Sequence, residues 1–144
     1  MWCGSWGKGW AEIGGPRLYC FLMCNEVRAE EAGQYSLVRV FYRVHPRTYP
    51  CYFSCYLVVG WYGESGPHTF GLRFLDPDRH LVLWEMPSQP FLLGPDLPYA
   101  NVIVRLEGLA LHREGRHWFQ VLLDGAPCAE FPMEVVGGTP AVVS

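Results

Sequence analysis

The sequence predicts an all-β fold: a two-sheet antiparallel β-sandwich, immunoglobulin-like, of about eight strands. Apolar and polar residues alternate with a period of two on both sides of Asp124-Gly125. Such a pair between two alternating runs is the strongest short-range signal of a β-hairpin. Short alternating segments bounded by glycine and proline recur through the rest of the chain. No stretch combines a sustained helical period with capping residues, so helices are not expected in the core.

Three parts of the chain differ in composition. Residues 1–16 form an irregular arm rich in glycine and tryptophan, because so many glycines disfavour a helix. Residues 17–136 form the β-sandwich domain, and residues 137–144 form a C-terminal tail that is expected to fray. The tryptophans of the arm are Trp2, Trp6 and Trp10. The arm is expected either to fold back on the domain or to serve as a contact segment.

The first three strands are predicted before the middle of the chain. The run Leu18–Cys24 is apolar on both faces, as is typical of a central strand. Tyr35–His45 alternates and forms the second strand, with Arg39 and Arg43 opposite its valines. Cys51–Tyr62 forms the third strand. Its predicted inward-facing residues are Phe53, Cys55, Leu57, Val59 and Trp61.

The remaining strands are predicted between turn signals. His68–Leu75 and Leu81–Met86 form the fourth and fifth strands, and Asn101–Leu109 forms the sixth. Residues 87–99 contain four prolines, which lack the donor that a central strand needs, so they form a crossover loop or an edge segment. The last two strands are those of the hairpin at Asp124-Gly125.

The order of these segments resembles an uncharacterised bacterial domain family, a domain of unknown function, over residues 17–136. The motifs that carry the resemblance are Leu18-Tyr19-Cys20-Phe21-Leu22-Met23-Cys24, Gly33-Gln34-Tyr35-Ser36-Leu37-Val38-Arg39-Val40-Phe41, Leu72-Arg73-Phe74-Leu75-Asp76-Pro77-Asp78, Asn101-Val102 and Leu122-Leu123-Asp124-Gly125. The resemblance implies a compact β-sandwich without an established activity, and no site residue is carried over from it. The chain departs from the family at Arg39, where a small residue is expected, and at its tryptophan-rich start.

The six cysteines are interpreted mainly as reduced thiols of the core, because a free thiol behaves as a small hydrophobe. Cys20/Cys24 and Cys51/Cys55 are each four residues apart, about 13 Å along a strand, so neither pair can close on itself. A cross-strand disulfide and a metal site remain alternatives. One conceivable zinc centre combines His112, His117 and Cys128, although exposed turn histidines are the simpler interpretation.

No catalytic motif stands out. Asp76-Pro77-Asp78 resembles the start of a calcium loop, but the later ligands and glycine are missing, so a turn is the better interpretation. The sequence contains no glycine-rich phosphate loop and no nucleophile elbow. The chain is therefore predicted not to be an enzyme and to need no cofactor or metal.

The net charge of −3 and the aromatic content of 15% indicate a protein that acts through surface contacts rather than through catalysis. Nucleic acid is not expected as a partner, because it needs a basic surface. A membrane is not expected either, because no apolar run is long enough to span one. Without a clear signal-peptide core, a cytoplasmic location is predicted.

Two binding hypotheses follow. Tyrosine and arginine are enriched at protein–protein hot spots, which favours an interaction domain that binds another protein or itself. The predicted contact residues are Arg39, Arg43, Tyr52, Tyr56 and Tyr62. Alternatively, residues 1–16 or 87–99 cover this face and form a second small core. The second hypothesis is a small-ligand or carbohydrate-binding sandwich that stacks its ligand on Trp61, Trp84 or Trp118.

Overall fold

The computed structural model describes residues 15–139, which form two packed β-sheets. The arm tryptophans Trp2, Trp6 and Trp10 lie outside the described residues, as does most of the predicted tail. The elements in chain order are β1 (Arg17–Ala29), the 3₁₀ helix η2 (Glu31–Gly33), β2 (Tyr35–Phe41), β3 (Arg43–Val44), β4 (Cys51–Tyr62), β5 (Gly66–Leu75), β6 (Val82–Leu93), β7 (Tyr99–Leu111), β8 (Gly115–Leu123) and β9 (Ala126–Val135). The prediction of a β-sandwich is confirmed.

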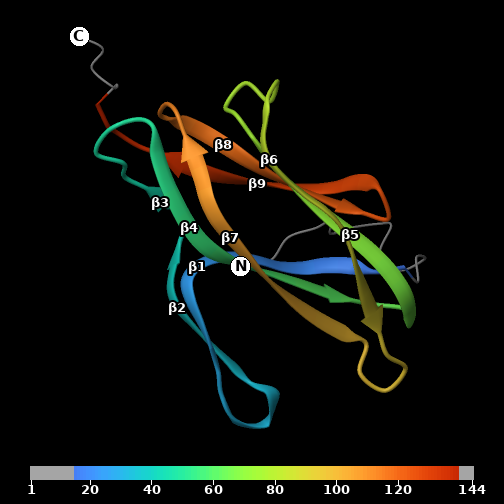
Figure 1. Ribbon diagram of the computed structural model, residues 1–144. Helices are drawn as coiled ribbons and strands as arrows, with labels where there is room; N and C mark the ends of the chain where they lie inside the picture. Colours follow the sequence, from blue (N-terminus) through green and yellow to red (C-terminus); the bar gives the residue numbers. More distant parts are fainter. Residues whose placement is uncertain (1–14, 140–144) are drawn as a thin grey trace.

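The two sheets lie face to face (Figure 1). The four-stranded sheet has the order β2-β1-β4-β7, and the five-stranded sheet has the order β3-β9-β8-β5-β6. All pairings are antiparallel except that between β3 and β9. The largest fully buried side chains between the sheets include Trp61, Phe70, Phe74 and Phe119. Removal of these large apolar surfaces from water is the main driving force for the packing.

The hairpin of β8 and β9 is the one predicted at Asp124-Gly125. Both residues have positive φ, +48° and +85°, as a type I′ turn requires. β4 also has the predicted bounds and facing: Cys55, Leu57, Val59 and Trp61 are buried within the core. The period of two therefore identified the inner face of this strand correctly.

The predicted second strand, Tyr35–His45, is divided by the structure. β2 ends at Phe41 and pairs with β1, whereas β3 begins at Arg43 and joins the other sheet beside β9. Arg39 has a φ of +58°, a left-handed conformation that glycine, the smallest residue, adopts more readily because it has no Cβ. This backbone requirement agrees with the expectation of a small residue at this position. A single continuous strand was thus the wrong prediction, because the chain crosses between sheets here.

The proline-rich segment is also corrected. β6 continues through Pro87 and Pro90 to Leu93, so that within this segment only residues 94–98, between β6 and β7, connect one sheet to the other. The prolines are tolerated because β6 is the edge strand of its sheet, where missing donors face outward. Both predicted alternatives therefore occur: residues 87–93 are part of an edge strand, and residues 94–98 form the crossover.

The first residues of the predicted tail are attached to the domain. The backbone of Thr139 exchanges hydrogen bonds with Arg47 and Tyr49, and the hydroxyl of Tyr49 donates to the carbonyl of Gly137. Residues 137–139 therefore make hydrogen bonds to the domain, to the segment between β3 and β4. Within residues 15–139, the chain forms no helix that is long and apolar enough to cross a membrane.

Candidate functional site

The outer face of the four-stranded sheet is the face turned away from the core. Strand register arranges its side chains in rows across β1, β4 and β7. The rows are Cys20–Gly60–Asn101, Leu22–Val58–Ile103 and Cys24–Tyr56–Arg105, and Val40 of β2 extends the last one. The outer face of an antiparallel sheet is usually polar. Here the central row is apolar, and the row after it ends in a tyrosine and an arginine.

One end of the outer face is organised around Tyr19. A register shift between Leu18 and Cys20 gives β1 one extra residue at this point. The hydroxyl of Tyr19 donates a hydrogen bond to Oδ1 of Asn101, and its ring lies over the backbone of Gly60. Burial raises the pKa of the Tyr19 hydroxyl, so it stays protonated and remains a donor.

Tyr62, one of the predicted contact residues, lies at this same end. Its ring centroid is 6.1 Å from that of Tyr19 and 6.0 Å from that of Tyr99. Tyr19 and Tyr99 meet edge to face at 5.7 Å. Such aromatic groups favour offset or edge-to-face contacts. Tyr62 is thus partly covered by two tyrosines that the sequence interpretation did not include.

Tyr56 lies further along β4, and its partner is Arg105 of β7. The Arg105 guanidinium donates to the Tyr56 hydroxyl at 2.8 Å and lies 5.1 Å from the centre of its ring. Arg105 also pairs with Glu107. Tyr52 lies nearer the start of β4, opposite Ala110, with 67% of its surface exposed. The predicted tyrosine face therefore exists, but its stacked arginine is one that sequence reasoning missed.

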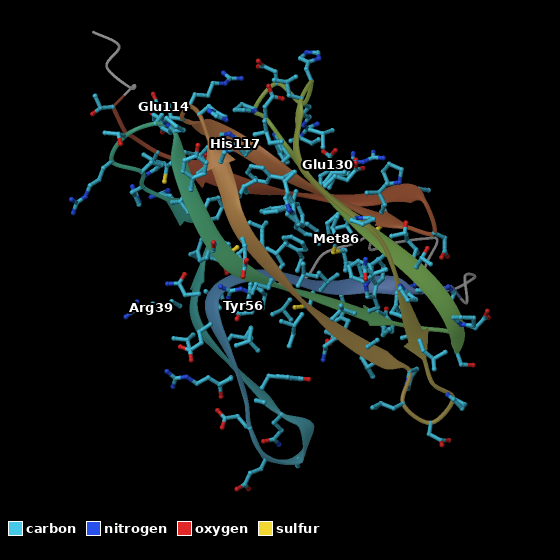
Figure 2. The ribbon with its side chains drawn as sticks, in the orientation of Figure 1. Arg39, Tyr56, Met86, Glu114, His117 and Glu130 are labelled. Carbon is cyan, nitrogen blue, oxygen red and sulfur yellow. The ribbon has the colours of Figure 1, made fainter. Side chains whose placement is uncertain are left out.

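The two predicted arginines lie apart from Tyr56. Arg39 is exposed on β2, and Figure 2 shows it at the outside of the molecule. Arg28 and, to a smaller extent, Arg39 hold the pKa of Glu26 below its usual range. Arg43 belongs to β3 and is in register with Glu134 of the five-stranded sheet. The structure does not bring Arg43 together with the β4 tyrosines, because the chain changes sheets before it.

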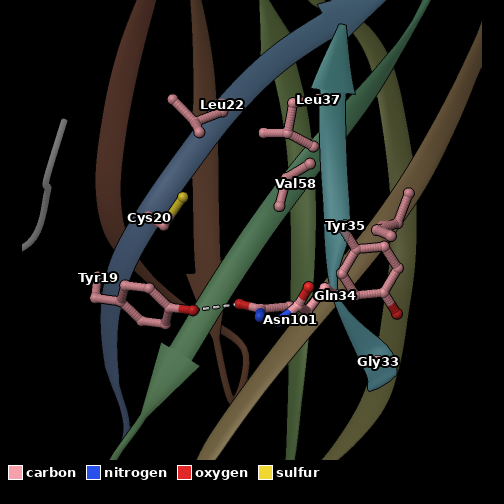
Figure 3. A pocket seen from close by; sticks show the side chains of 10 residues that line it. Tyr19, Cys20, Leu22, Gly33, Gln34, Tyr35, Leu37, Val58 and Asn101 are labelled. Atoms are coloured by element: carbon pink, nitrogen blue, oxygen red, sulfur yellow. Dashed lines mark hydrogen bonds between the residues drawn. The ribbon is translucent and has the colours of Figure 1, made fainter. Parts of the chain in front are cut away.

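A pocket of about 500 Å³ opens between the outer face and the start of β2. β1 extends beyond its pairing with β4, and β2 returns alongside this extension (Figure 3). The residues that line the pocket are Tyr19, Cys20, Leu22, Gly33, Gln34, Tyr35, Leu37, Val58, Asn101 and Ile103. Burial raises the pKa of the Cys20 thiol, so that this wall of the pocket carries a neutral group.

The three predicted stacking tryptophans do not form one platform. Trp61 is fully buried, so it is not available to a ligand, and that prediction is corrected. Trp84 packs against the core from the edge strand β6. Trp118 is covered by the Arg79 guanidinium, 4.0 Å from its ring centre. A sequence cannot reveal this cover, because Arg79 reaches Trp118 from a distant turn.

The histidines and cysteines do not form a metal centre among residues 15–139. His117 is buried against Phe74, and burial lowers its pKa. His112 is exposed, as is Cys128. The five cysteines of this part of the chain are free thiols, and burial raises the pKa of Cys55 to about 12. Such a thiol is unreactive at neutral pH, as expected for a core residue.

The fold and the site define a two-sheet β-sandwich with a partly apolar outer face. The chain belongs to DUF6941, a family of unknown function, whose model matches residues 19–136. No curated protein shows a significant match to the chain. One similar solved structure is the alkylpurine DNA glycosylase AlkC of Pseudomonas fluorescens, bound to DNA containing an abasic site analogue, with 12% identity and a TM-score of 0.46. The match covers 67% of this chain and 28% of that chain.

Proposed function

We propose that the chain is a non-catalytic interaction domain that binds another protein or a second copy of itself through β7 and the adjoining outer face. The observation that carries this proposal is the edge that β7 presents. Among residues 15–139, no strand pairs with β7 on the side away from β4. An unpaired edge offers backbone donors and acceptors to an incoming strand.

The other edge strands are poor templates by comparison. β6 carries Pro87 and Pro90, while β2 and β3 are short, at 7 and 2 residues. β7 has 13 residues and contains no proline. Natural edge strands are commonly protected by shortness or proline. The contrast supports β7 as the edge kept open for a partner.

The side chains beside this edge support the same proposal. Val102 and Val104 pack against the core but are only half-buried, because no strand covers them. Tyr56 and Arg105 lie on the outer face of the same two strands, and Tyr52 is exposed further along. Tyrosine and arginine are the residue types enriched in binding hot spots. An added strand would gain backbone pairing from β7 and side-chain contacts from its neighbours.

The strand order also supports an immunoglobulin-like topology as part of this proposal. β4 and β7 take the places of strands B and E, and β9-β8-β5-β6 take those of G, F, C and C′.

A cytoplasmic location belongs to the proposal as well. Its support is that the five cysteines within residues 15–139 are unpaired, as is usual in reducing compartments.

The test uses two valine substitutions on opposite edges. Because Val104 packs against the core and Val82 is exposed, circular dichroism first establishes that each variant is folded. Val104→Lys places a charge where a strand would pair with β7, whereas Val82→Lys places one on β6. Sedimentation of the purified chain measures self-association, and affinity capture with quantitative mass spectrometry measures other partners. We expect association or capture to be lost in Val104→Lys and retained in Val82→Lys. The proposal would be overturned if the wild type, Val104→Lys and Val82→Lys gave indistinguishable results. It would also be overturned if the wild type neither self-associated nor captured a partner.

A further inference from the structure

The pocket beside Tyr19 has the dimensions of a small-molecule site. Its volume of about 500 Å³ lies within the range of about 300–1,000 Å³ typical of such sites. Its floor comes from β1, β4 and β7, and its roof comes from residues 33–37 (Figure 3). The pocket is therefore an open cleft with one wall from the sheet and the other from the start of β2.

The walls of the pocket are mainly apolar. Leu22, Val58 and Ile103 form one continuous row across three strands, and Leu37 faces them from β2. Val58 keeps only 8% of its surface exposed although it belongs to the outer face. Leu22 and Ile103 are only partly buried, so an apolar ligand body lying on this row would remove their remaining exposed surface from water, which favours binding.

One end of the pocket is polar and carries the exposed amide of Asn101. Oδ1 of Asn101 accepts the hydrogen bond from the Tyr19 hydroxyl. Asn101 is exposed, so its amide nitrogen is open to solvent or to a ligand, and Gln34 lines the same end of the pocket (Figure 3). With Oδ1 turned toward Tyr19, the amide nitrogen is the side of Asn101 that is left to donate. A carbonyl oxygen on a ligand is the complement of that donor.

The pocket contains no charged side chain. None of its ten lining residues is Asp, Glu, Lys, Arg or His. Burial raises the pKa values of Tyr19 and Cys20, so both remain neutral. An ion placed here would lose hydration without gaining a counter-charge, which disfavours charged ligands.

We propose that this pocket binds a neutral small molecule with an apolar body and one carbonyl or amide group directed at Asn101. The apolar body lies along the Leu22–Val58–Ile103 row beneath Leu37. The proposal goes beyond protein binding at β7 and rests on different atoms, so each can fail without the other.

Three probes of one shape test the proposed chemistry by NMR titration. 2-Naphthamide is neutral and has a carbonyl, 2-naphthoate is its anionic counterpart, and 2-methylnaphthalene lacks the polar group. We expect saturable binding of naphthamide, with chemical-shift changes at Leu22, Val58 and Ile103. We expect the affinity for naphthoate to be lower by about tenfold or more, because its charge finds no partner in the pocket. Absence of saturable naphthamide binding, or equal binding of naphthoate, would overturn the proposal.

Substitutions locate the binding in the pocket. Ile103→Trp fills it from the floor and Leu37→Trp fills it from the roof, so at least one folded variant is expected. Each should weaken naphthamide binding about tenfold or more, whereas Leu92→Trp on exposed β6 should not. Asn101→Ala should remove the preference for naphthamide over 2-methylnaphthalene. Unchanged binding in a folded pocket-filling variant would show that the probe binds elsewhere and would refute the assignment.

Cysteine alkylation gives an independent footprint. Cys20 lines the pocket, whereas Cys128 is exposed on β9, away from it. Desolvation raises the pKa of both thiols, that of Cys128 to about 11, so alkylation by N-ethylmaleimide is followed at about pH 9 to 10, where more thiolate is present. Saturating naphthamide should slow alkylation of Cys20 and leave that of Cys128 unaffected, as measured by peptide mass spectrometry. Equal rates at Cys20 with and without the probe would contradict occupancy of this pocket.

Discussion

The ring of Tyr19 occupies the space where a side chain at Gly60 would begin. A Cβ at Gly60 would lie 2.7 Å from Cζ of Tyr19 and 3.0 Å from Oδ1 of Asn101. Gly60 is therefore required by the tyrosine above it rather than by a turn. This contact holds one end of the outer face together, because Tyr19 can reach Asn101 only by crossing β4 at a residue without a side chain.

Gly60→Ala should destabilise the domain by about 1–3 kcal/mol in the free energy of unfolding, because the added methyl overpacks the Tyr19 ring. Gly71→Ala is the matched control: its Cβ would lie 3.6 Å from the nearest atom, an ordinary contact. Chemical denaturation should show little loss for Gly71→Ala. Tyr19→Ala should relieve part of the Gly60→Ala defect in the double variant. Equal effects of the two glycine substitutions would contradict the close contact.

Phe119 and Phe131 should differ in their contribution to stability. Phe119 is fully buried, with ring centroids 4.7 Å from Phe74 and 5.5 Å from Phe21. Phe119→Ala should cost about 3–5 kcal/mol of unfolding free energy through lost burial and a cavity. Phe131 stacks on Phe21 but is only half-buried, so Phe131→Ala should cost about 2 kcal/mol. Thermal or chemical unfolding measures both, and a larger loss for Phe131 would contradict the facing of the hairpin.

The Tyr56–Arg105 contact should show measurable coupling. A double-mutant cycle with Tyr56→Phe, Tyr56→Leu and Arg105→Ala separates the hydrogen bond from stacking on the ring. The stacking is expected to contribute about 0.5–1 kcal/mol, because the pair is partly exposed. Tyr52→Leu with Arg105→Ala is the control cycle and should show no coupling, since Tyr52 lies opposite Ala110. Coupling in the control cycle alone would mean that the arginine stacks elsewhere.

His117 should make stability depend on pH near neutrality. Burial lowers its pKa below the ordinary value of 6.5, so the unfolded chain binds a proton at a pH where the folded chain does not. Stability is therefore highest above pH 6.5 and falls as the pH decreases below it. His117→Gln should reduce this slope between about pH 7.5 and 5, whereas His112→Gln, at an exposed position, should not. Denaturation measured across this range would contradict the prediction if the wild type and His117→Gln had parallel profiles.

Local patterns were sufficient for much of the fold. The alternation in residues 51–62 and around Asp124-Gly125 predicted three strands and a turn correctly, because one face of each strand is dry and a period of two records it. The division at Phe41 and Arg43 was missed because both halves alternate alike, and only their pairing partners differ. Pro87 and Pro90 were ambiguous because an edge strand and a loop tolerate proline equally.

The candidate site was predictable only in part. Tyr52, Tyr56 and Tyr62 share a face of β4, as strand parity implies. Arg105 was missed because its contact with Tyr56 depends on β7 lying beside β4, and the two residues are 49 positions apart. Trp61 was wrongly expected to be exposed as a ligand platform, although parity had already placed it with the inward residues.

The amino-acid sequence by itself determined the class of fold, the inward face of β4, the turn at Asp124-Gly125 and the family resemblance, because these depend on spacing between near neighbours. The tertiary structure alone decided which strands lie side by side, and hence the open β7 edge, the Tyr56–Arg105 pair and the pocket roofed by residues 33–37. The physical reason is that a period of two records which face of a strand is dry but carries no information about its neighbour. Neighbours are selected by the collective packing of both sheets.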